Sequence, residues 1–366
     1  MIPVYEPYFP KGSLTYAHNA LESTWVSSKG KYLEKVKEWL AEYYGTEYII
    51  LTNSGTAANH LMARAIHEKY PERHNLICPN NSYVAAWNPF LFDNMFRLAP
   101  VDANEKTWNM DYKEMTADGW ATVQLIVHNL GNMVNVPLLK SRLKNTIFIE
   151  DNCEGFGGMY EEHPAGTASK AFSLSFFGNK NVTSGEGGAF ITYDEHLYDT
   201  AFRFWGQGME PNGQKFIHAD IGHNYRMTNI EAAILLWQLE NFYLIKELKE
   251  RLFRKYRDGL KDVEGIELQM KSFGTTPSNW MFGVRFDNSY YPAAEKFFYD
   301  FGIETRPMFY PITAHEHLKD VKSKTSVAAK LAKEVVIFPS FPSLGDDEID
   351  RVVEVIKHYA KGISIL

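Results

Sequence analysis

Cysteine and long apolar runs are the features that this sequence most clearly lacks. Its 366 residues include two cysteines, Cys78 and Cys153, which are too few for a disulfide framework. The sequence has no C-x-x-C pair and no cluster of His and Cys, so we expect no metal site. No apolar run approaches the roughly 18 residues that a membrane-spanning helix needs. These absences indicate a protein of a reducing compartment that does not cross a membrane.

Concentrated charge is also missing. The chain has 45 acidic and 38 basic residues, a net charge of -7, and no run of five like charges. Nucleic-acid polymers and anionic membranes usually require a basic patch or tract, so we expect neither as a partner. Residues 1–10 carry Glu6 and three prolines where a secretory signal would have a basic region and an apolar region. We therefore expect the protein in the cytoplasm.

The sequence does contain short apolar runs that alternate with segments of helix length. Apolar residues recur at helical spacing over residues 31–45, where Gly45 fits a C-terminal stop. Apolar strands separated by helices are typical of a mostly parallel sheet that is covered on both faces. The expected strands are residues 48–52, 76–78, 97–101, 125–128, 146–149, 171–176 and 188–192. The pattern predicts a large α/β domain.

A second, smaller α/β domain is expected in the last third of the chain. Thr228 and Glu231 have the spacing of a capping box and begin a helical pattern that continues to about Gly259, away from the large domain. The later patterns are a strand near 280–286, a helix near 293–301, a proline-rich turn at 305–311 and a helix from 346 to about 360. We assign residues 1–245 to the large domain and 246–366 to the small C-terminal domain, on which the N-terminal segment is free to pack.

The first motif with chemical meaning is Ser54-Gly55-Thr56-Ala57, at the junction of an expected strand and a helix. The free amides of a first helical turn, a neighbouring hydroxyl and the helix dipole form an anion site that suits a phosphate monoester. An ordinary helix N-cap explains the same residues equally well.

The second motif is the acidic pair Glu150-Asp151 at the end of an apolar strand. Ligands of open α/β sheets bind outside the carboxyl ends of the strands, and a carboxylate is the partner that a protonated pyridine nitrogen needs. Glu154 could reach the same ring. The alternative is that Asp151 caps a helix and Glu154 is solvated.

The third motif is a loop with one lysine, Lys180, between Ser175 and the glycines that end at Gly188. A lysine amine in a glycine-rich, aromatic-flanked loop after a strand is a candidate nucleophile that forms Schiff bases. The alternative is a surface lysine, because most lysines are exposed.

The order of these motifs resembles that of the DegT/DnrJ/EryC1/StrS family, the sugar aminotransferases that depend on pyridoxal phosphate (PLP). The resemblance implies the type I fold of aspartate aminotransferase, with a large, mostly parallel sheet domain and a smaller C-terminal α/β domain. It runs over nearly the whole chain. The motifs that carry it are residues 23–30, 54–57, 150–151, 175–180 with 185–188, 224–229 and 302–307.

The resemblance implies two catalytic residues. Lys180 lies at the position of the lysine that binds PLP covalently and then moves protons. Asp151 lies at the position of the carboxylate that faces the ring nitrogen.

The resemblance also implies a set of contacts to the cofactor. Gly55, Thr56, Ala57 and Ser175 fall where the family binds the phosphate, and Asn224 falls where a neighbouring subunit adds to it, which implies a homodimer with shared active sites. The remaining two contacts are Tyr83, which is expected to stack on the ring unless it packs in the core, and Glu154, near the ring hydroxyl.

A nucleotide diphosphate sugar needs hydrogen-bond donors and positive charge. Our candidates for this site are Trp25, Ser27, Ser28, Lys29 and Arg306. A surface salt bridge is the alternative role for Arg306.

The sequence departs from the family pattern near these candidates. Thr313 stands where the family commonly has His, after Arg306-Pro307-Met308-Phe309-Tyr310-Pro311. In addition, His223 replaces a common Tyr. These departures bear on which nucleotide and which sugar epimer the substrate contains.

The activity implied by the resemblance is transfer of an amino group from L-glutamate to C4 of a nucleotide-linked 4-keto-6-deoxyhexose, with pyridoxamine phosphate as the intermediate carrier. The favoured product is GDP-perosamine, and the alternative is viosamine made from a dTDP- or UDP-linked sugar. A sugar 3-dehydratase is less expected, because that subgroup has His in place of Lys180. A non-catalytic regulator with the same fold is also less expected, because neither a DNA-binding module nor a damaged site is seen.

Overall fold

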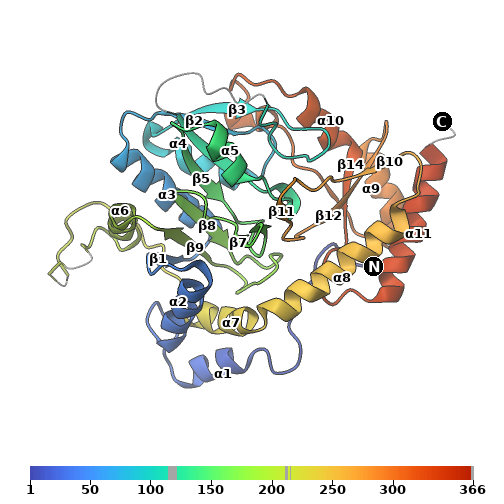
Figure 1. Cartoon of the computed structure of the whole chain (residues 1–366). Helices are drawn as coiled ribbons and strands as arrows, with labels where there is room; N and C mark the ends of the chain where they lie inside the picture. The colour runs from blue at the N-terminus through green and yellow to red at the C-terminus, as the bar shows by residue number, and fades with distance from the viewer. Residues whose placement is uncertain (114–121, 211–212, 215, 364–366) are drawn as a thin grey trace.

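A seven-stranded sheet forms the centre of the larger part of the molecule (Figure 1). The computed structural model describes residues 1–113, 122–210, 213–214 and 216–363. The strand order is β1-β9-β8-β5-β4-β2-β3, and every pair is parallel except those of β9 with β1 and β8. The strands are β1 (Ile49–Thr52), β2 (Asn75–Pro79), β3 (Arg97–Val101), β4 (Thr122–Val127), β5 (Ile147–Asp151), β8 (Ala171–Ser175) and β9 (Gly188–Thr192). The predicted mostly parallel sheet is confirmed.

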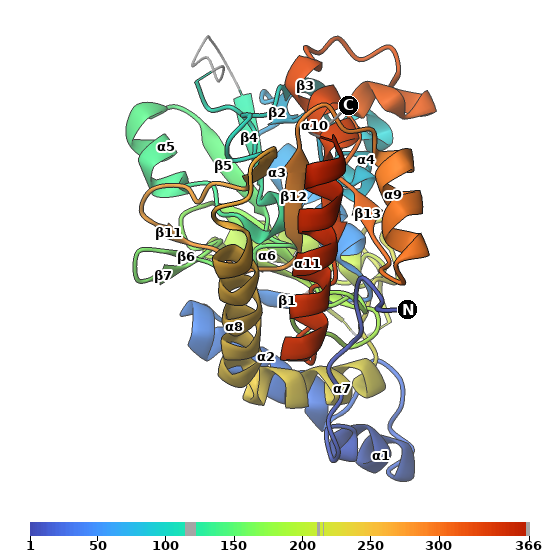
Figure 2. The same cartoon turned by 90° about the vertical axis from the view of Figure 1, so that its right-hand side faces the viewer.

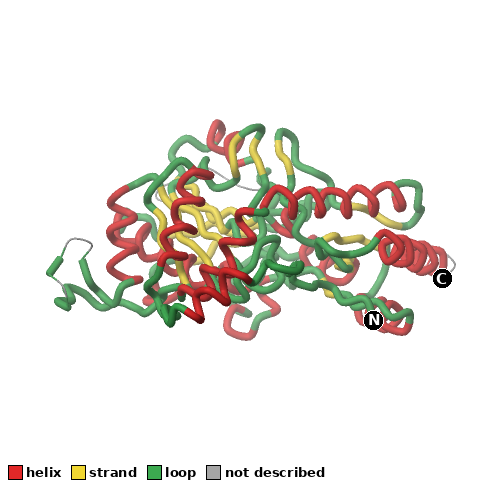
Figure 3. The backbone as a smooth tube through the Cα atoms, turned by 90° about the horizontal axis from the view of Figure 1, so that it is seen from below, coloured by secondary structure: helices red, strands yellow, loops and turns green. Residues whose placement is uncertain are grey.

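Helices cover both faces of this sheet because successive strand residues point to opposite sides. In β1, Ile50 packs with helices α3, α4 and α6, while Ile49 and Leu51 pack with α2 and α7. The helices of this part are α1 (Thr15–Glu22), α2 (Lys31–Tyr44), α3 (Gly55–Lys69), α4 (Asn88–Leu91), α5 (Val136–Arg142), α6 (Glu195–Trp205) and α7 (Asn229–Glu240). Figure 3 shows the strands enclosed between helices.

A second sheet, antiparallel and four-stranded, has the order β10-β12-β14-β13. Its strands are β10 (Ile266–Leu268), β12 (Phe282–Phe286), β13 (Arg306–Pro307) and β14 (Val335–Phe338), and its helices are α8 (Phe242–Leu260), α9 (Tyr291–Asp300), α10 (Ser326–Glu334) and α11 (Asp346–Ile363). Figure 2 shows α8 and α11 side by side. The N-terminal segment joins this part: Ile2 N donates to Gly302 O at 2.8 Å, and Ser340 N donates to Val4 O at 3.0 Å. The boundary between residues 245 and 246 stays a prediction.

The continuous helix expected from Thr228 to about Gly259 is wrong. The capping box is present, since the Thr228 side chain accepts from Glu231 N and the Glu231 side chain accepts from Thr228 N. However, the helix stops at Asn241 (φ -106°, ψ 18°), whose side chain donates to Trp237 O at 2.8 Å. The Asn241 side chain thus shares Trp237 O with its own backbone N–H, which donates at 3.1 Å, and α8 leaves at an angle to α7 (Figure 2).

Several short elements complete the structure. The remaining elements are β6 (Met159–Tyr160), β7 (His163–Pro164) and β11 (Thr275–Thr276), and the short helices Val84–Ala86, Phe92–Asn94, Asn129–Gly131, Ile312–Ala314 and Glu316–Leu318.

Both cysteines are free. Among the helices described, none is both long and apolar enough to cross a membrane.

Candidate active site

A cavity of about 660 Å³ lies at the carboxyl ends of β1, β2, β5 and β8, against the segments near Trp280 and Arg306. This is where a parallel sheet is expected to bind ligands. The structure brings most of the predicted site residues together here. Those that line the cavity are Gly55, Thr56, Tyr83, Asp151, Glu154, Ser175, Lys180 and Arg306.

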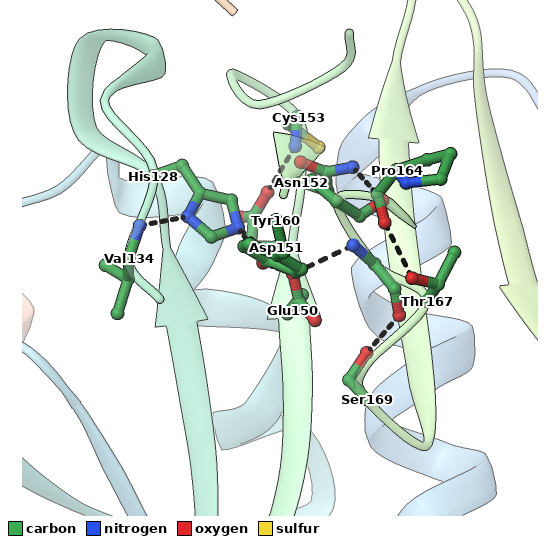
Figure 4. A network of polar contacts seen from close by, with 12 residues as sticks. His128, Val134, Glu150, Asp151, Asn152, Cys153, Tyr160, Pro164, Thr167 and Ser169 are labelled. Atoms are coloured by element: carbon green, nitrogen blue, oxygen red, sulfur yellow. Dashed lines mark hydrogen bonds and ion pairs between the residues drawn. The ribbon is translucent and has the colours of Figure 1, made fainter. Parts of the chain in front are cut away.

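Asp151 is the last residue of β5, and its side chain is held in one orientation. Asn59 Nδ2 donates to Oδ2 at 2.8 Å. Cys153 N donates to Oδ1 at 3.1 Å (Figure 4). The Asn59 amide is itself fixed, because Ser173 Oγ donates to Asn59 Oδ1 at 2.6 Å. Asp151 is only 5% exposed. The site therefore has a buried carboxylate whose direction is determined before a ligand binds.

Glu150, the neighbour of Asp151, belongs to a different environment (Figure 4). Its Oε2 lies 3.1 Å from His128 Nε2 and also accepts a hydrogen bond from the Tyr160 hydroxyl. Val134 N donates to His128 Nδ1 at 3.1 Å, so the ring proton is on Nε2, which donates to the carboxylate. This buried network fixes the end of β5. The acidic pair thus separates into one structural carboxylate and one that faces the cavity.

Helix α3 begins at Gly55 beside the cavity. Ser54 caps it, the alternative that the sequence left open, because its Oγ accepts from Ala57 N at 3.1 Å. That bond occupies the Ala57 amide, and the cavity lining among the described residues does not include Ala57. A Cβ atom at Gly55 would lie 2.8 Å from both Cys153 Sγ and Ser175 Cβ. Only glycine therefore lets this helix start approach β8 so closely.

Lys180 lies in a loop that is anchored to two distant segments. Its carbonyl oxygen accepts from the Tyr5 hydroxyl at 2.7 Å, and the carbonyl of Asn179 accepts from Trp280 Nε1 at 2.7 Å. The Lys180 Nζ atom lies 4.0 Å from the centroid of the Trp280 ring. The side chain lines the cavity and is half-buried, unlike a solvated surface lysine.

Glu154 is buried rather than solvated, with 5% exposure. Burial raises the pKa of its carboxyl to about 7, while the charge of Lys180 and a hydrogen bond from Leu130 N act to lower this pKa. The Leu130 N to Oε2 distance is 2.9 Å. Near neutral pH this group is divided between its acid and carboxylate forms.

Tyr83 and Arg306 lie at the mouth of the cavity. Tyr83 is 62% exposed, so it does not pack in the core. Arg306 is exposed on β13 and makes no ion pair within the described part of the chain, so the salt-bridge alternative is not observed.

His315 also lines the cavity, and our sequence reasoning missed it. Its Nε2 is buried and has no hydrogen-bond partner among the described residues. Burial lowers its pKa below the usual value, and His317 adds to the effect. Its position two residues after Thr313, where the family commonly has His, could have identified it.

The remaining predicted residues do not reach the cavity of their own chain. Asn224 is exposed, and the cavity lining among the described residues includes neither it nor Trp25, Ser27, Ser28 and Lys29. The segment around Trp25 is instead tied to the start of α7. Asn229 Nδ2 donates to Trp25 O at 2.7 Å, and Asn229 N donates to Ser27 O at 2.7 Å.

Within an α/β fold, a strand-end aspartate and a lysine amine that share one cavity are typical of enzymes that depend on PLP. Residues 10–357 match the DegT/DnrJ/EryC1/StrS aminotransferase family. The chain belongs to this family.

Relatives of known name cover nearly the whole chain. GDP-perosamine synthase of Escherichia coli O157:H7 is 32% identical over 98% of both chains, and that of Vibrio cholerae is 28% identical over 98% of this chain and 99% of its own. Among solved structures, a sugar aminotransferase of Micromonospora echinospora superposes with a TM-score of 0.86 at 23% identity, covering 98% of this chain and all of its own. The predicted fold, the aminotransferase class and the PLP cofactor are confirmed.

Proposed function

We propose that this enzyme transfers the amino group of L-glutamate to C4 of GDP-4-keto-6-deoxymannose and produces GDP-perosamine. The identity of 28–32% to GDP-perosamine synthases over nearly the whole chain supports this substrate. The observation that carries the proposed chemistry is the presence of the Asp151 carboxylate and the Lys180 amine in one cavity. We assign the reaction to the cytoplasm, in line with two free cysteines.

The lining residues fit PLP by charge and shape. Asp151 would hold the protonated ring nitrogen, and Tyr83 offers a ring face at the mouth of the cavity. The start of α3, with Gly55 and Thr56, and the Ser175 hydroxyl would hold the phosphate. Residue 55 is a glycine, so no side chain of this residue covers the helix start. PLP supplies an electron sink for the electrons released at Cα of the amino acid.

Lys180 would move the protons of both half-reactions. Its Nζ would take a proton from Cα of glutamate in the first half and deliver one to C4 of the sugar in the second. Glu154 would lie near the ring hydroxyl, where its pKa of about 7 allows it to hold or release a proton at neutral pH. Arg306 would bind the diphosphate.

We further infer a homodimer with shared active sites. Asn224 and the segment of Trp25, Ser27, Ser28 and Lys29 are largely exposed and lie outside their own cavity. In a dimer these residues would complete the cavity of the partner, with Asn224 at the phosphate and the segment at the nucleotide sugar.

The substrate is tested by supplying L-glutamate with the GDP-, dTDP- or UDP-linked 4-keto-6-deoxyhexose and identifying the product by NMR. We expect a C4 amine, formed fastest from the GDP-linked sugar. A higher rate with the dTDP- or UDP-linked sugar would contradict GDP-perosamine as the product and favour nucleotide-linked viosamine. Loss of the C3 hydroxyl would identify a 3-dehydratase, the activity of a solved relative with 22% identity and a TM-score of 0.89.

A further inference from the structure

The indole ring of Trp280 lies directly beside the Lys180 amine. The distance from Nζ to the ring centroid is 4.0 Å, and Trp280 is only 7% exposed. Tryptophan gives the strongest cation–π contact of the aromatic side chains, and exclusion of water strengthens it. The ring is also fixed in orientation, because its Nε1 donates to the carbonyl of Asn179, the residue before Lys180.

A buried lysine, Lys249 of α8, supports Trp280 from the side of the second sheet. Lys249 is 1% exposed, and its Nζ donates to Trp280 O at 2.7 Å and to Ser340 O. Burial lowers the pKa of this amine well below its usual value.

The same amine also faces the second residue that holds Lys180. Lys249 Nζ lies 5.4 Å from the centroid of the Tyr5 ring, and the Tyr5 hydroxyl donates to Lys180 O at 2.7 Å. Tyr5 therefore holds the backbone of Lys180, while Trp280 borders its amine. Lys249 contacts both of them.

We propose that Trp280 is a positioning residue for the Lys180 amine and that Lys249 keeps Trp280 and Tyr5 in place. This inference rests on the proposed role of Lys180 in proton transfer. When the Lys180 amine is protonated, the indole face holds it at one side of the cavity. In the transfer to C4 of the sugar, the protonated amine then starts from one position and does not have to be recovered from solvent.

The first test measures the reactivity of Lys180 in the full-length chain without PLP. Acetic anhydride modifies unprotonated, accessible amines, and peptide mapping gives the rate at Lys180 relative to the exposed Lys296. We expect Trp280→Leu to raise the relative rate by about fivefold or more, and Trp280→Phe to restore most of the protection because phenylalanine keeps a ring face. Rates within about twofold of wild type in both variants would overturn the proposal.

The second test uses two matched substitutions on α8. Lys249→Met removes the buried amine, while Lys255→Met removes a partly exposed one that pairs with Asp350 at 2.9 Å. We expect Lys249→Met to raise Lys180 modification and to lower kcat about tenfold with KM for L-glutamate changed by less than about twofold. Lys255→Met should change neither. The same response in both variants, or a loss of thermal stability alone in Lys249→Met, would contradict the positioning role.

Covalent capture of PLP separates this inference from the proposed function. Borohydride reduction of the wild-type holoenzyme should leave a pyridoxyl group on Lys180. If the group is found elsewhere, the proposed function fails. If Lys180 carries it while Trp280→Leu and Lys249→Met behave as wild type, only the positioning role fails.

Discussion

Asp151 accepts hydrogen bonds from Asn59 and from the Cys153 amide, so its carboxylate is held in place before a ligand binds. In Asp151→Asn the charge that we propose lies opposite the ring nitrogen is lost, while the size of the side chain is kept. Because a charge-assisted hydrogen bond contributes about 1.5–3 kcal/mol, we expect both half-reactions to slow by about 10- to 100-fold. Stopped-flow absorbance measures each half separately, and Asp194→Asn on the remote helix α6 is the control. Slowing of one half only would contradict this role of Asp151.

The raised pKa of the Glu154 carboxyl predicts that the free energy of unfolding depends on pH. Burial raises the pKa of its carboxyl from 4.5 to about 7, so the folded chain binds the proton more tightly than the unfolded chain. The resulting stabilisation is complete below pH 4.5 and is lost as the pH rises through 7, by about 3 kcal/mol in total. Glu154→Gln removes this contribution.

Urea unfolding of the full chain without PLP, at pH 5 and pH 8, measures the effect. The wild type should lose more unfolding free energy than Glu154→Gln between these two pH values. Glu162→Gln, an exposed control, should follow the wild type. An equal pH dependence in wild type and Glu154→Gln would show that the Glu154 carboxyl is not buried in this way.

At the residue scale, the sequence predicted the residues that occupy recognisable local positions. Asp151 ends an apolar strand and Lys180 lies in a glycine-rich loop, so neighbouring residues marked them as candidates, and the order of the motifs and the family resemblance then selected them. Trp280 and Lys249 were missed because their roles depend on contacts between distant segments, such as the bond from Lys249 to Trp280 O. No local pattern marks such residues.

At the scale of elements, the start of α3 depends on the absence of a side chain at Gly55. A Cβ there would lie 2.8 Å from Cys153 Sγ and Ser175 Cβ, so Gly55→Ala must displace the helix start or β8. We expect a loss of about 1–3 kcal/mol in stability and at least about tenfold weaker PLP binding. In the control Gly178→Ala, the nearest atom lies 3.8 Å away, and binding should be retained. Fluorescence titration with PLP provides the measurement, and unchanged binding in Gly55→Ala would contradict the geometry.

The strands were easier to predict than the helix boundaries. Buried strands such as β5 and β8 read as continuous apolar runs, because both faces of the sheet are covered. The break at Asn241 was not visible, since apolar residues continue at helical spacing on both sides of it. The break coincides with a hydrogen bond from the Asn241 side chain to Trp237 O, which the apolar pattern does not reveal.

At the scale of the whole molecule, the proposed dimer predicts recovery of activity by mixing two inactive variants. Lys180→Ala removes the amine, and Asn224→Ala removes a group that we assign to the partner's cavity. A mixed dimer would contain one complete cavity, so the mixture should regain up to about a quarter of the wild-type activity.

The control for this experiment mixes Lys180→Ala with Asp151→Asn. Both residues lie in the same cavity of one chain, so each cavity of the mixed dimer lacks one of them, and mixing should not raise the activity of this pair. The decisive variant is the double substitution Lys180→Ala with Asn224→Ala, mixed with wild type. If Asn224 acts across the interface, its loss should impair the wild-type subunit in the mixed dimer, and an unimpaired wild-type subunit would contradict shared sites.

The net charge of the molecule and the charge of its ligands have the same sign. The net charge of -7 argued against polymeric anions as partners, yet PLP and a nucleotide diphosphate sugar are anions. The groups suited to bind these anions are instead local: the start of α3, Lys180 and Arg306 border one cavity.

The most direct test of the central claim follows the nitrogen of ¹⁵N-labelled L-glutamate into the sugar. With GDP-4-keto-6-deoxymannose as acceptor, NMR should detect labelled nitrogen at C4 of the product of the wild-type enzyme and none with Lys180→Ala. Labelled product at the wild-type rate in Lys180→Ala, or no labelled sugar from the wild type with any nucleotide-linked 4-keto-6-deoxyhexose, would contradict the account.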